Sequence, residues 1–325
     1  MKKILVTGGA GYIGSNICNL LIEKGYAVTI VDNLSTGNKK LVHKQAKLHV
    51  CDISNTKQII KIIKNQKYEL LIHLAGLTKI NESIQKPKKY LLVNYVKAKL
   101  FLNTCLDHGI DKVIISSSAS VYGNKNKKNI KENDTLNPTN PYALSKLKLE
   151  NFILNNSKKF KYVILRYFNV AGADYKLRFG LTDKNSQNLI KIASQVALET
   201  RKKLIINGSN YKTKDGTPIR DFIHVSDLAE IHIRVCKYLI DGGKSNLFNC
   251  GYGVGYSVMD IVNEFEKITK KKFNYKLGPR RIGDCANIVA DIKKFKKKFS
   301  WRPKYKKLSY LLKNSLDWEN KLNRY

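Results

Sequence analysis

The sequence predicts an α/β fold, in which a doubly wound parallel sheet is combined with a smaller mixed α/β C-terminal domain. Three observations support this prediction. Short apolar stretches alternate with helical patterns up to residue 170, a glycine-rich turn joins the first apolar stretch to the first helix, and the alternation breaks after residue 170. Strands that alternate with helices are typical of parallel sheets. A chain of 325 residues that is 43% hydrophobic is long enough for two such domains.

The break in the pattern predicts two domains. We place the first at residues 1–170 and most of the second at residues 171–325. The stretch 219–250 combines a strand pattern with a long amphipathic helix pattern, which is typical of the first domain. We therefore expect residues 219–250 to return to the first domain and the two domains to be interleaved.

The glycine-rich turn predicts a dinucleotide site. Gly8, Gly11 and Gly14 lie between an apolar strand at 3–7 and a helix pattern at 13–24. Glycines there let the backbone approach a pyrophosphate, which the positive helix N-terminus attracts. The next strand ends in Asp32, 18 residues after Gly14, where a carboxylate accepts hydrogen bonds from the adenosine ribose. A carboxylate repels a 2′-phosphate, so the pattern of this Rossmann domain favours NAD over NADP.

Two further strands end in residues suited to the same site. The stretch 47–52 ends in Asp52, and the strand at 70–73 is followed by Ala75 and Gly76. Ligands bind at the carboxyl ends of the strands in such sheets. We expect these residues to lie beside the glycine-rich turn.

Ser118, Tyr142 and Lys146 predict the chemistry. Tyr142 and Lys146 are four residues apart in a helix pattern, which puts them on one face. A neighbouring ammonium favours the phenolate and lowers the tyrosine pKa from its usual value of about 10. A phenolate near neutral pH is a general base for a hydroxyl group. Ser118, at the end of an apolar strand, is placed to hydrogen-bond the same hydroxyl.

Composition excludes several classes of protein. No apolar run reaches the roughly 18–20 residues that a membrane span needs, and the apolar run after the N-terminal lysines is too short for a signal peptide. The six cysteines are scattered without a paired spacing, which predicts reduced thiols and a cytoplasmic location. The six histidines show no metal-binding spacing, so we expect no metal.

The net charge of +35 admits two interpretations. Nucleic-acid binding is one of them. However, the lysines are spread along the whole chain and are not gathered in one arm. We favour a solvated basic surface, which would also steer anionic nucleotides to the protein, and we expect no specific nucleic-acid partner.

Two helix patterns predict an assembly. The stretches 90–106 and 142–156 are apolar on more than one side. One side can cover the sheet, and the other suits a partner helix. We expect these two helices to pair with those of a second copy in a homodimer.

A set of longer stretches carries a family resemblance. They are TGGAGYIGSN, VDNLSTG, HLAGLTKINESIQKP, SSSASVYG, PYALSKLKLE, LRYFNVAGA, DGTPIRDFIHVSDLA and GPRRIGD. Together they resemble the extended short-chain dehydrogenase/reductases, and most closely the UDP-glucose (UDP-galactose) 4-epimerases, over nearly the whole chain. The resemblance implies a tightly held NAD that takes hydride from carbon 4 of a UDP-hexose and returns it to the other face of a 4-keto sugar.

The resemblance also implies roles for individual residues. Tyr142 is the base, Lys146 lowers the pKa of Tyr142 and binds the nicotinamide ribose, and Ser118 orients the sugar. Further cofactor-binding residues are Gly8, Gly11, Tyr12, Ile13, Gly14, Asp32, Asn33, Asp52, Ile53, Leu74, Ala75, Gly76, Asn94 and Phe168. The UDP-sugar is expected to contact Ser118, Tyr142, Asn169, Asn188, Leu189, Arg220, Arg281 and Asp284.

Three positions depart from the family pattern. Thr78 precedes Lys79 where the family often has lysine, Asn207 stands where the family has an aromatic residue near uracil, and Ile288 lies at the expected substrate gate. A tyrosine at the gate disfavours N-acetylated sugars and a small residue admits them. Isoleucine is intermediate, so a UDP-N-acetylglucosamine 4-epimerase, or an enzyme of dual specificity, stays open as the alternative.

Other functions fit less well. A nucleotide-sugar 4,6-dehydratase needs an acid beside the catalytic serine, and Ser118 is followed by Ala119 and Ser120. An enzyme that acts on UDP-glucuronate needs an extra cation for the carboxylate, which the sequence does not exclude. A silent NAD-binding protein or a nucleic-acid-binding protein is the remaining class. The intact Ser118, Tyr142 and Lys146 argue against the first of these, and the dispersed lysines argue against the second.

Overall fold

The computed structural model describes residues 1–64, 66–125, 127–281 and 284–324. The chain divides into two compact units, each built from several segments. Unit 1 contains Met1–Val121, Pro138–Arg166 and Ala229–Phe248. Unit 2 contains Tyr122–Asn137, Tyr167–Leu228 and Asn249–Tyr325.

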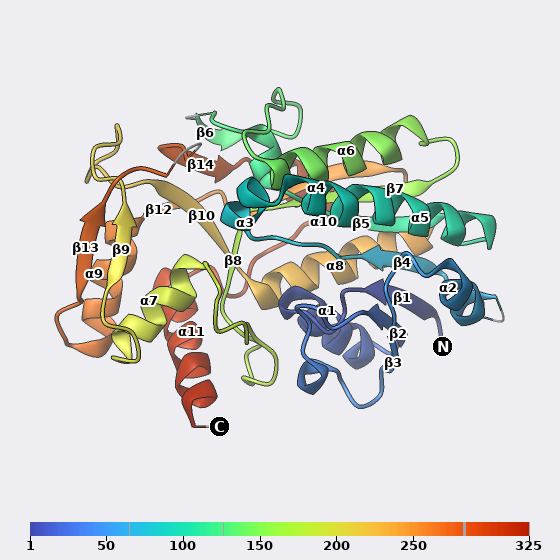
Figure 1. Ribbon diagram of the computed structural model, residues 1–325, viewed down its shortest axis with the longest axis horizontal. Helices are drawn as coiled ribbons and strands as arrows, with labels where there is room; N and C mark the ends of the chain where they lie inside the picture. The colour runs from blue at the N-terminus through green and yellow to red at the C-terminus, as the bar shows by residue number, and fades with distance from the viewer. Residues whose placement is uncertain (65, 126, 282–283, 325) are drawn as a thin grey trace. The chain divides into compact units, whose positions relative to one another are not determined.

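A parallel sheet forms the centre of unit 1 (Figure 1). In the part of the chain that the structure describes it has seven strands in the order β11-β7-β5-β4-β1-β2-β3. The pairs β1/β2, β2/β3, β1/β4 and β4/β5 are parallel. The strands are β1 Lys3–Thr7, β2 Ala27–Asp32, β3 Lys47–Val50, β4 Leu70–His73, β5 Lys112–Ser118, β7 Lys161–Tyr167 and β11 Asn246–Cys250.

The strand order reverses beside β1. Strands β2 and β3 continue from one side of β1, whereas β4 and β5 lie on its other side. In folds of this kind, ligands bind at the carboxyl ends of the strands where the strand order reverses. Gly8 follows β1 and Leu74 follows β4, so the predicted cofactor residues lie at this switch point.

Helices cover the sheet of unit 1. They are α1 Tyr12–Glu23, α2 Thr56–Ile63, α3 Ile80–Gln85, α4 Pro87–Leu91, α5 Ala98–Asp107, α6 Pro141–Asn155 and the greater part of α8 Val225–Ile240. Short 3-10 turns lie at Lys39–Leu41 and Ala119–Tyr122, and a π-helical segment, Leu92–Lys97, joins α4 to α5. Helices α4, α5 and α6 lie side by side (Figure 1). Phe101, Leu149 and Ile164 belong to the buried core that α5, α6 and the sheet share.

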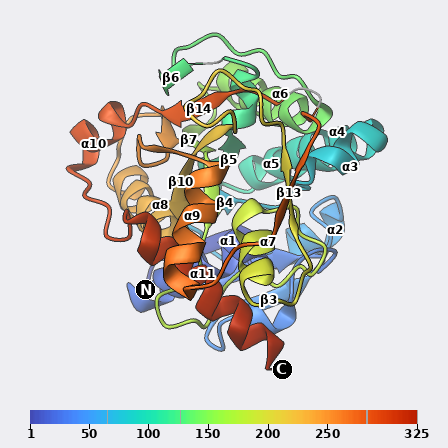
Figure 2. The same cartoon turned by 90° about the vertical axis from the view of Figure 1, so that its left-hand side faces the viewer.

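Unit 2 combines a mixed sheet with a helical layer. Among the described residues the larger sheet has five strands, β12-β10-β14-β6 with β8 paired to β10, and a smaller sheet pairs β9 with β13. Helices α7, α9 and α11 pack on one another (Figure 2). The elements are β6 Lys127–Ile130, β8 Asn169–Ala171, α7 Leu189–Ala197, β9 Leu204–Asn207, β10 Ile219–His224, β12 Gly255–Ser257, α9 Val258–Thr269, β13 Tyr275–Gly278, β14 Asn287–Ala290, α10 Lys293–Phe299 and α11 Leu308–Asn323.

One strand lies in a stretch whose local composition is typical of a loop. The polar, basic stretch 124–131 contains β6, which pairs in parallel with β14. The backbone of β6 pairs with a strand that lies more than 150 residues later in the chain, and Ile130 is buried. Local composition carries no information on such distant pairing.

No helix in the described part of the chain is long and apolar enough to cross a membrane.

Candidate active site

The turn between β1 and α1 is built for the close approach of another molecule's backbone or phosphates. Gly8 has a φ of +70°, and a Cβ on it would lie 2.8 Å from the amide nitrogen of Ala75. A Cβ on Gly14 would lie 2.1 Å from the carbonyl oxygen of Gly8. Helix α1 begins after Gly11 without a side-chain cap and without an acidic residue in its first turn. Its N-terminus therefore presents the positive end of the helix dipole, which suits a pyrophosphate.

Asp32 ends β2 beside this turn and also shapes it. One of its carboxylate oxygens accepts a hydrogen bond from the Ala10 amide at 3.0 Å, and the other accepts one from Leu34 at 2.8 Å. A carboxylate has about four acceptor positions. Two thus stay available for ribose hydroxyls after the loops on either side have been fixed.

Asp52 follows β3 and is held by its neighbours. It accepts hydrogen bonds from Ser54, Asn33 and the Lys97 ammonium, the last at 2.9 Å. Burial acts to raise its pKa, but these donors outweigh burial and hold the pKa well below its usual range. Asp52 is therefore ionised at neutral pH, and its pairing with Asn33 connects the ends of two adjacent strands. Ile53, the next residue, is buried.

The loop after β4 contacts the helices above it. Leu74 and Ala75 donate their amides to the hydroxyl of Thr7. Asn94 of the π-helical segment is buried and makes three hydrogen bonds, two with the backbone of Leu77 and one with Ser145 of α6. These three hydrogen bonds of the Asn94 side chain therefore hold the loop against α6.

Ser118, Tyr142 and Lys146 come together as predicted. Pro141 occupies the first turn of α6 and the Asn140 side chain caps it, so Tyr142 and Lys146 face the sheet. The Tyr142 hydroxyl is hydrogen-bonded to Ser118 of β5. The Lys146 ammonium donates to the carbonyl and hydroxyl oxygens of Ser116, at 3.1 and 3.3 Å. Gly76 lies beside this ammonium, because a Cβ on it would be 3.6 Å away.

The expected depression of the tyrosine pKa is not found. Burial raises the pKa of Tyr142, and the hydrogen bond with Ser118 acts in the opposite direction without reversing the shift. The physical reason is that Tyr142 is only 8% exposed and that the Lys146 ammonium bonds to Ser116. Burial also lowers the pKa of Lys146, to about 8, while Glu150 acts to raise it.

Glu150 and Arg166 are absent from the sequence prediction. Glu150 lies four residues after Lys146 on α6 and is 0% exposed. Its carboxylate accepts hydrogen bonds from Ser117 of β5 and from two nitrogens of Arg166 of β7, at 3.0 and 2.6 Å. Removing one partner of a buried, forked ion pair of this kind costs about 3–5 kcal/mol. The four-residue spacing that links Tyr142 to Lys146 could have found Glu150, whereas nothing local marks Arg166.

In unit 2, Arg220 and Asp284 form an ion pair, although they are 64 residues apart in the chain. Arg220 also donates to the carbonyl oxygens of Ile219 and Cys285, both at 2.8 Å. The guanidinium is thus fixed while part of its donor set stays available. On the neighbouring strand Asn169 donates to the carbonyl of Asp221. Phe168 is buried, and its amide donates to Cys250.

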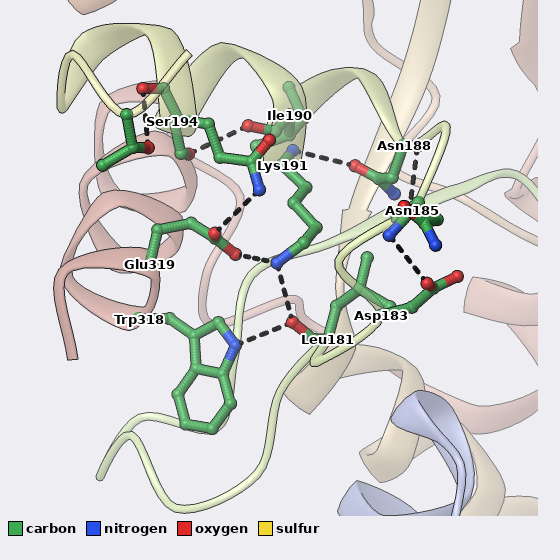
Figure 3. A network of polar contacts seen from close by, with 12 residues as sticks. Leu181, Asp183, Asn185, Asn188, Ile190, Lys191, Ser194, Trp318 and Glu319 are labelled. Carbon is green, nitrogen blue, oxygen red and sulfur yellow. Dashed lines mark hydrogen bonds and ion pairs between the residues drawn. The ribbon is translucent and has the colours of Figure 1, made fainter. Parts of the chain in front are cut away.

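Asn188 caps α7 (Figure 3). Its side-chain oxygen accepts the Lys191 amide at 3.2 Å, and its side-chain nitrogen donates to Val170 of β8 at 2.9 Å. Leu189, the first residue of α7, packs against the core of unit 2. The Lys191 ammonium pairs with Glu319 of α11 and donates to the Leu181 carbonyl, so the segment that ends in Asn188 is anchored on both sides.

Other predicted residues are less constrained. Arg281 is exposed, and residues 282 and 283 lie outside the described part of the chain. Asn207 ends β9 half-buried and donates to the Ile205 carbonyl. Thr78 is exposed. Ile288 is half-buried and lies opposite Arg220 in the pairing of β10 with β14. Within the described residues no group of three or more His, Cys, Asp or Glu side chains is placed to hold a metal ion.

Comparison with known proteins agrees with this geometry. The model of the "NAD dependent epimerase/dehydratase family" matches residues 4–251. The chain belongs to this family. It is 38% identical to a UDP-glucose 4-epimerase of Azospirillum brasilense, over 99% of this chain and 93% of that protein.

Solved structures extend the comparison to the whole fold. A UDP-glucose 4-epimerase from Bifidobacterium longum, in complex with NAD+ and UDP, is 33% identical, with a TM-score of 0.92 over 98% of both chains. A UDP-Glc/GlcNAc 4-epimerase from Campylobacter jejuni is 38% identical, with a TM-score of 0.86 over 99% of this chain and 100% of that one. The family is NAD dependent, and the cradle between Gly8, Gly14 and Ala75 fits such a cofactor.

Gly14 gives a test of the cradle. Because a Cβ on Gly14 would meet the Gly8 carbonyl at 2.1 Å, Gly14→Ala must displace the turn. We expect the purified variant to lose most of its bound NAD, measured by absorbance after denaturation, and to melt at a lower temperature. Far-UV circular dichroism serves as the control for the fold. A folded variant that retains a full complement of NAD would contradict this assignment.

Proposed function

We propose that the protein interconverts UDP-glucose and UDP-galactose by NAD-dependent epimerisation at carbon 4 through a transient 4-keto sugar. The observation that carries the proposal is the meeting of α6 with the carboxyl end of β5, where Tyr142 interacts with Ser118 and Lys146 donates to Ser116, in the same unit as the glycine cradle. The names of relatives from several organisms support the substrate.

The cofactor is held by residues at the carboxyl ends of β1, β2, β3 and β4, by residues of α6, and by Asn94 and Phe168. When bound, NAD supplies the hydride acceptor and donor for carbon 4 of the sugar. Gly8, Gly11 and Gly14 admit its pyrophosphate, and Asp32 accepts hydrogen bonds from its ribose. Its remaining contacts come from Tyr12, Ile13, Asn33, Asp52, Ile53, Leu74, Ala75, Gly76, Asn94, Tyr142, Lys146 and Phe168. All of these residues except Phe168 belong to unit 1, which is the NAD-binding domain of the proposal.

Tyr142 is the general base. Its phenolate takes the proton of the sugar 4-hydroxyl and later returns it, while Ser118 hydrogen-bonds the same hydroxyl. Burial opposes the phenolate. The Lys146 ammonium and the positive charge of the oxidised nicotinamide ring therefore have to stabilise it in the working enzyme. Lys146 also contacts the nicotinamide ribose.

The nucleotide of the substrate is held by unit 2. Arg220 and Arg281 suit the diphosphate because a guanidinium makes paired, charge-assisted hydrogen bonds. Asn169, Asn188, Leu189 and Asp284 complete the contacts. A firm grip on UDP with few contacts to the hexose lets the keto sugar turn over between the two hydride transfers.

Specificity for UDP-N-acetylglucosamine is the second candidate, and two observations favour it. Ile288, at the expected gate, lies opposite Arg220 in the β10/β14 pairing and is smaller than tyrosine. The protein from Campylobacter jejuni is named as a UDP-Glc/GlcNAc 4-epimerase.

We also propose a cytoplasmic location, which the six free and buried cysteines support.

A homodimer is part of the proposal. Helices α5 and α6 and the π-helical segment expose a set of aliphatic side chains in unit 1, which we call the aliphatic row. Its members are Leu92, Val96, Leu100, Leu144 and Leu154, each 38–48% exposed. A second copy of the same surface would bury this row in a four-helix interface.

The first test is a product analysis. The purified protein is incubated separately with UDP-glucose and with UDP-N-acetylglucosamine, without added cofactor, and the sugars are separated. We expect UDP-galactose from the first. A product from the second shows dual specificity. No conversion of either substrate by protein that contains NAD contradicts the proposal.

The second test concerns the base. Tyr142→Phe removes one hydroxyl from a buried ring, so we expect the variant to fold and to keep NAD. General-base catalysis contributes about 10²–10⁴-fold, so kcat should fall by at least this much. Turnover within a few-fold of wild type would exclude Tyr142 as the base.

The third test concerns assembly. Val96→Asp places a charge in the aliphatic row, where a partner helix would have to bury it. Sedimentation velocity at micromolar concentration should show a dimer for the wild type and a monomer for the variant. The matched control Lys99→Asp changes charge on the neighbouring helix α5 outside this row. A monomeric wild type would refute the dimer.

A further inference from the structure

The buried charges of unit 1 extend beyond the residues that react. Three consecutive serines of β5 each contact a different residue of one face of α6. Ser118 bonds to Tyr142, Ser116 accepts from Lys146, and Ser117 donates to Glu150. Since Tyr142, Lys146 and Glu150 are spaced by four residues, each lies about one helical turn, roughly 6 Å, from the next.

Tyr142 and Lys146 share a protonation problem. When the pair has lost one proton, either of two forms can result. One has a phenolate and an ammonium, and the other has a neutral phenol and a neutral amine. Only the form with a phenolate and an ammonium has a base for the sugar hydroxyl. Both side chains are buried, and burial favours the form in which neither is charged.

Glu150 lies on the lysine side of this pair. It is one turn from Lys146 and two turns from Tyr142, so its negative charge stabilises a positive charge on Lys146 more than it opposes a negative charge on Tyr142. Arg166 and Ser117 donate hydrogen bonds to its oxygens and hold the carboxylate in place.

We infer that Glu150, anchored by Arg166, is a positioning residue that keeps the shared proton on Lys146 and thereby leaves Tyr142 free to act as the base. The inference rests on the proposed function for its catalytic consequence. The electrostatic part of the inference, the effect of Glu150 on the proton of Lys146, rests only on the place and contacts of Glu150.

His73 of β4 is a second titratable group that interacts with Lys146. Burial, and next the charge of Lys146, lower the pKa of His73 to about 3, so the imidazole is neutral where the enzyme works. It cannot replace the carboxylate as a counter-charge. Among the groups named here, Glu150 is therefore the one that stabilises the ammonium.

The pH dependence of kcat tests the catalytic consequence. Glu150→Gln keeps the shape and removes the charge. We expect the acidic and the alkaline limb of the kcat–pH profile to move to lower pH, and the maximal kcat to fall. A shift of about one pH unit in the alkaline limb would lower kcat about tenfold on that limb. Glu150→Asp retains the charge and should leave the limb closer to its wild-type position.

Glu319→Gln is the matched control. Glu319 is also a buried carboxylate paired with a lysine, but it lies in unit 2, where it bonds to Lys191 (Figure 3). Loss of the Glu319 charge should lower the stability of the protein without shifting the kcat–pH profile. A Glu150→Gln profile that overlaps the wild type, or that moves no more than the Glu319→Gln profile, overturns the inference while the proposed function stands.

A second measurement needs no activity. The folded pKa of Lys146, about 8, lies below its unfolded value of about 10.5. The unfolded chain therefore binds more protons between these pH values, and the Lys146 contribution makes stability rise with pH in this window. Glu150→Gln should extend the rise to lower pH, measured as melting temperature against pH. The same change made in the Lys146→Met background should have no such effect.

The outcomes separate the two proposals. A wild-type protein that converts neither UDP-sugar removes the proposed function, and the melting series still decides the role of Glu150. An equal effect of Glu150→Gln in both backgrounds overturns the inference. If Glu150→Gln does not fold, the double variant Glu150→Gln/Arg166→Gln avoids leaving the Arg166 guanidinium buried without its carboxylate. It should shift the melting profile in the same direction, and an unshifted profile overturns the inference.

Discussion

The structure of unit 1 depends on the register between the end of β5 and the inner face of α6. Three serines meet a tyrosine, a lysine and a glutamate, and the charged members of this contact are buried. A shift of α6 by one residue would turn all three side chains away from the strand, because helix positions differ by about 100° per residue. Burying ionised groups is costly unless each has partners, so the same contacts that place the base also require this register.

Neighbouring elements help to hold α6 in this register with β5. Asn140 and Pro141 begin α6 one residue before Tyr142, and Asn94 ties Ser145 to the loop after β4. That loop carries Gly76, which packs beside the Lys146 ammonium, while Ala75 closes on Gly8 of the first turn. The glycine cradle and the reactive side chains are therefore linked by short contacts through the carboxyl ends of adjacent strands. This explains why the chemistry and the dinucleotide site occur in one compact unit.

In unit 2, hydrogen bonds and ion pairs also fix polar side chains. The residues that we propose for substrate binding lie mainly on short strands and at the start of α7. Asn188 uses its whole amide to cap that helix and to bond β8. Arg220 is held by two carbonyl oxygens and by Asp284. Side chains that are fixed before a ligand arrives lose less entropy on binding, which suits a site that must hold a nucleotide firmly.

The sequence by itself determined the alternation of strands and helices, the glycine turn, Asp32 and the Tyr142–Lys146 spacing. These features depend on local periodicity and on short, fixed offsets along the chain, which a sequence displays directly. Only the tertiary structure decided that Arg166 meets Glu150, that Arg220 meets Asp284 and that β6 is a strand. It also decided that burial raises the pKa of Tyr142 despite the hydrogen bond with Ser118. The physical reason is that pairing between distant segments and the extent of desolvation are properties of the packed chain, which no local pattern records.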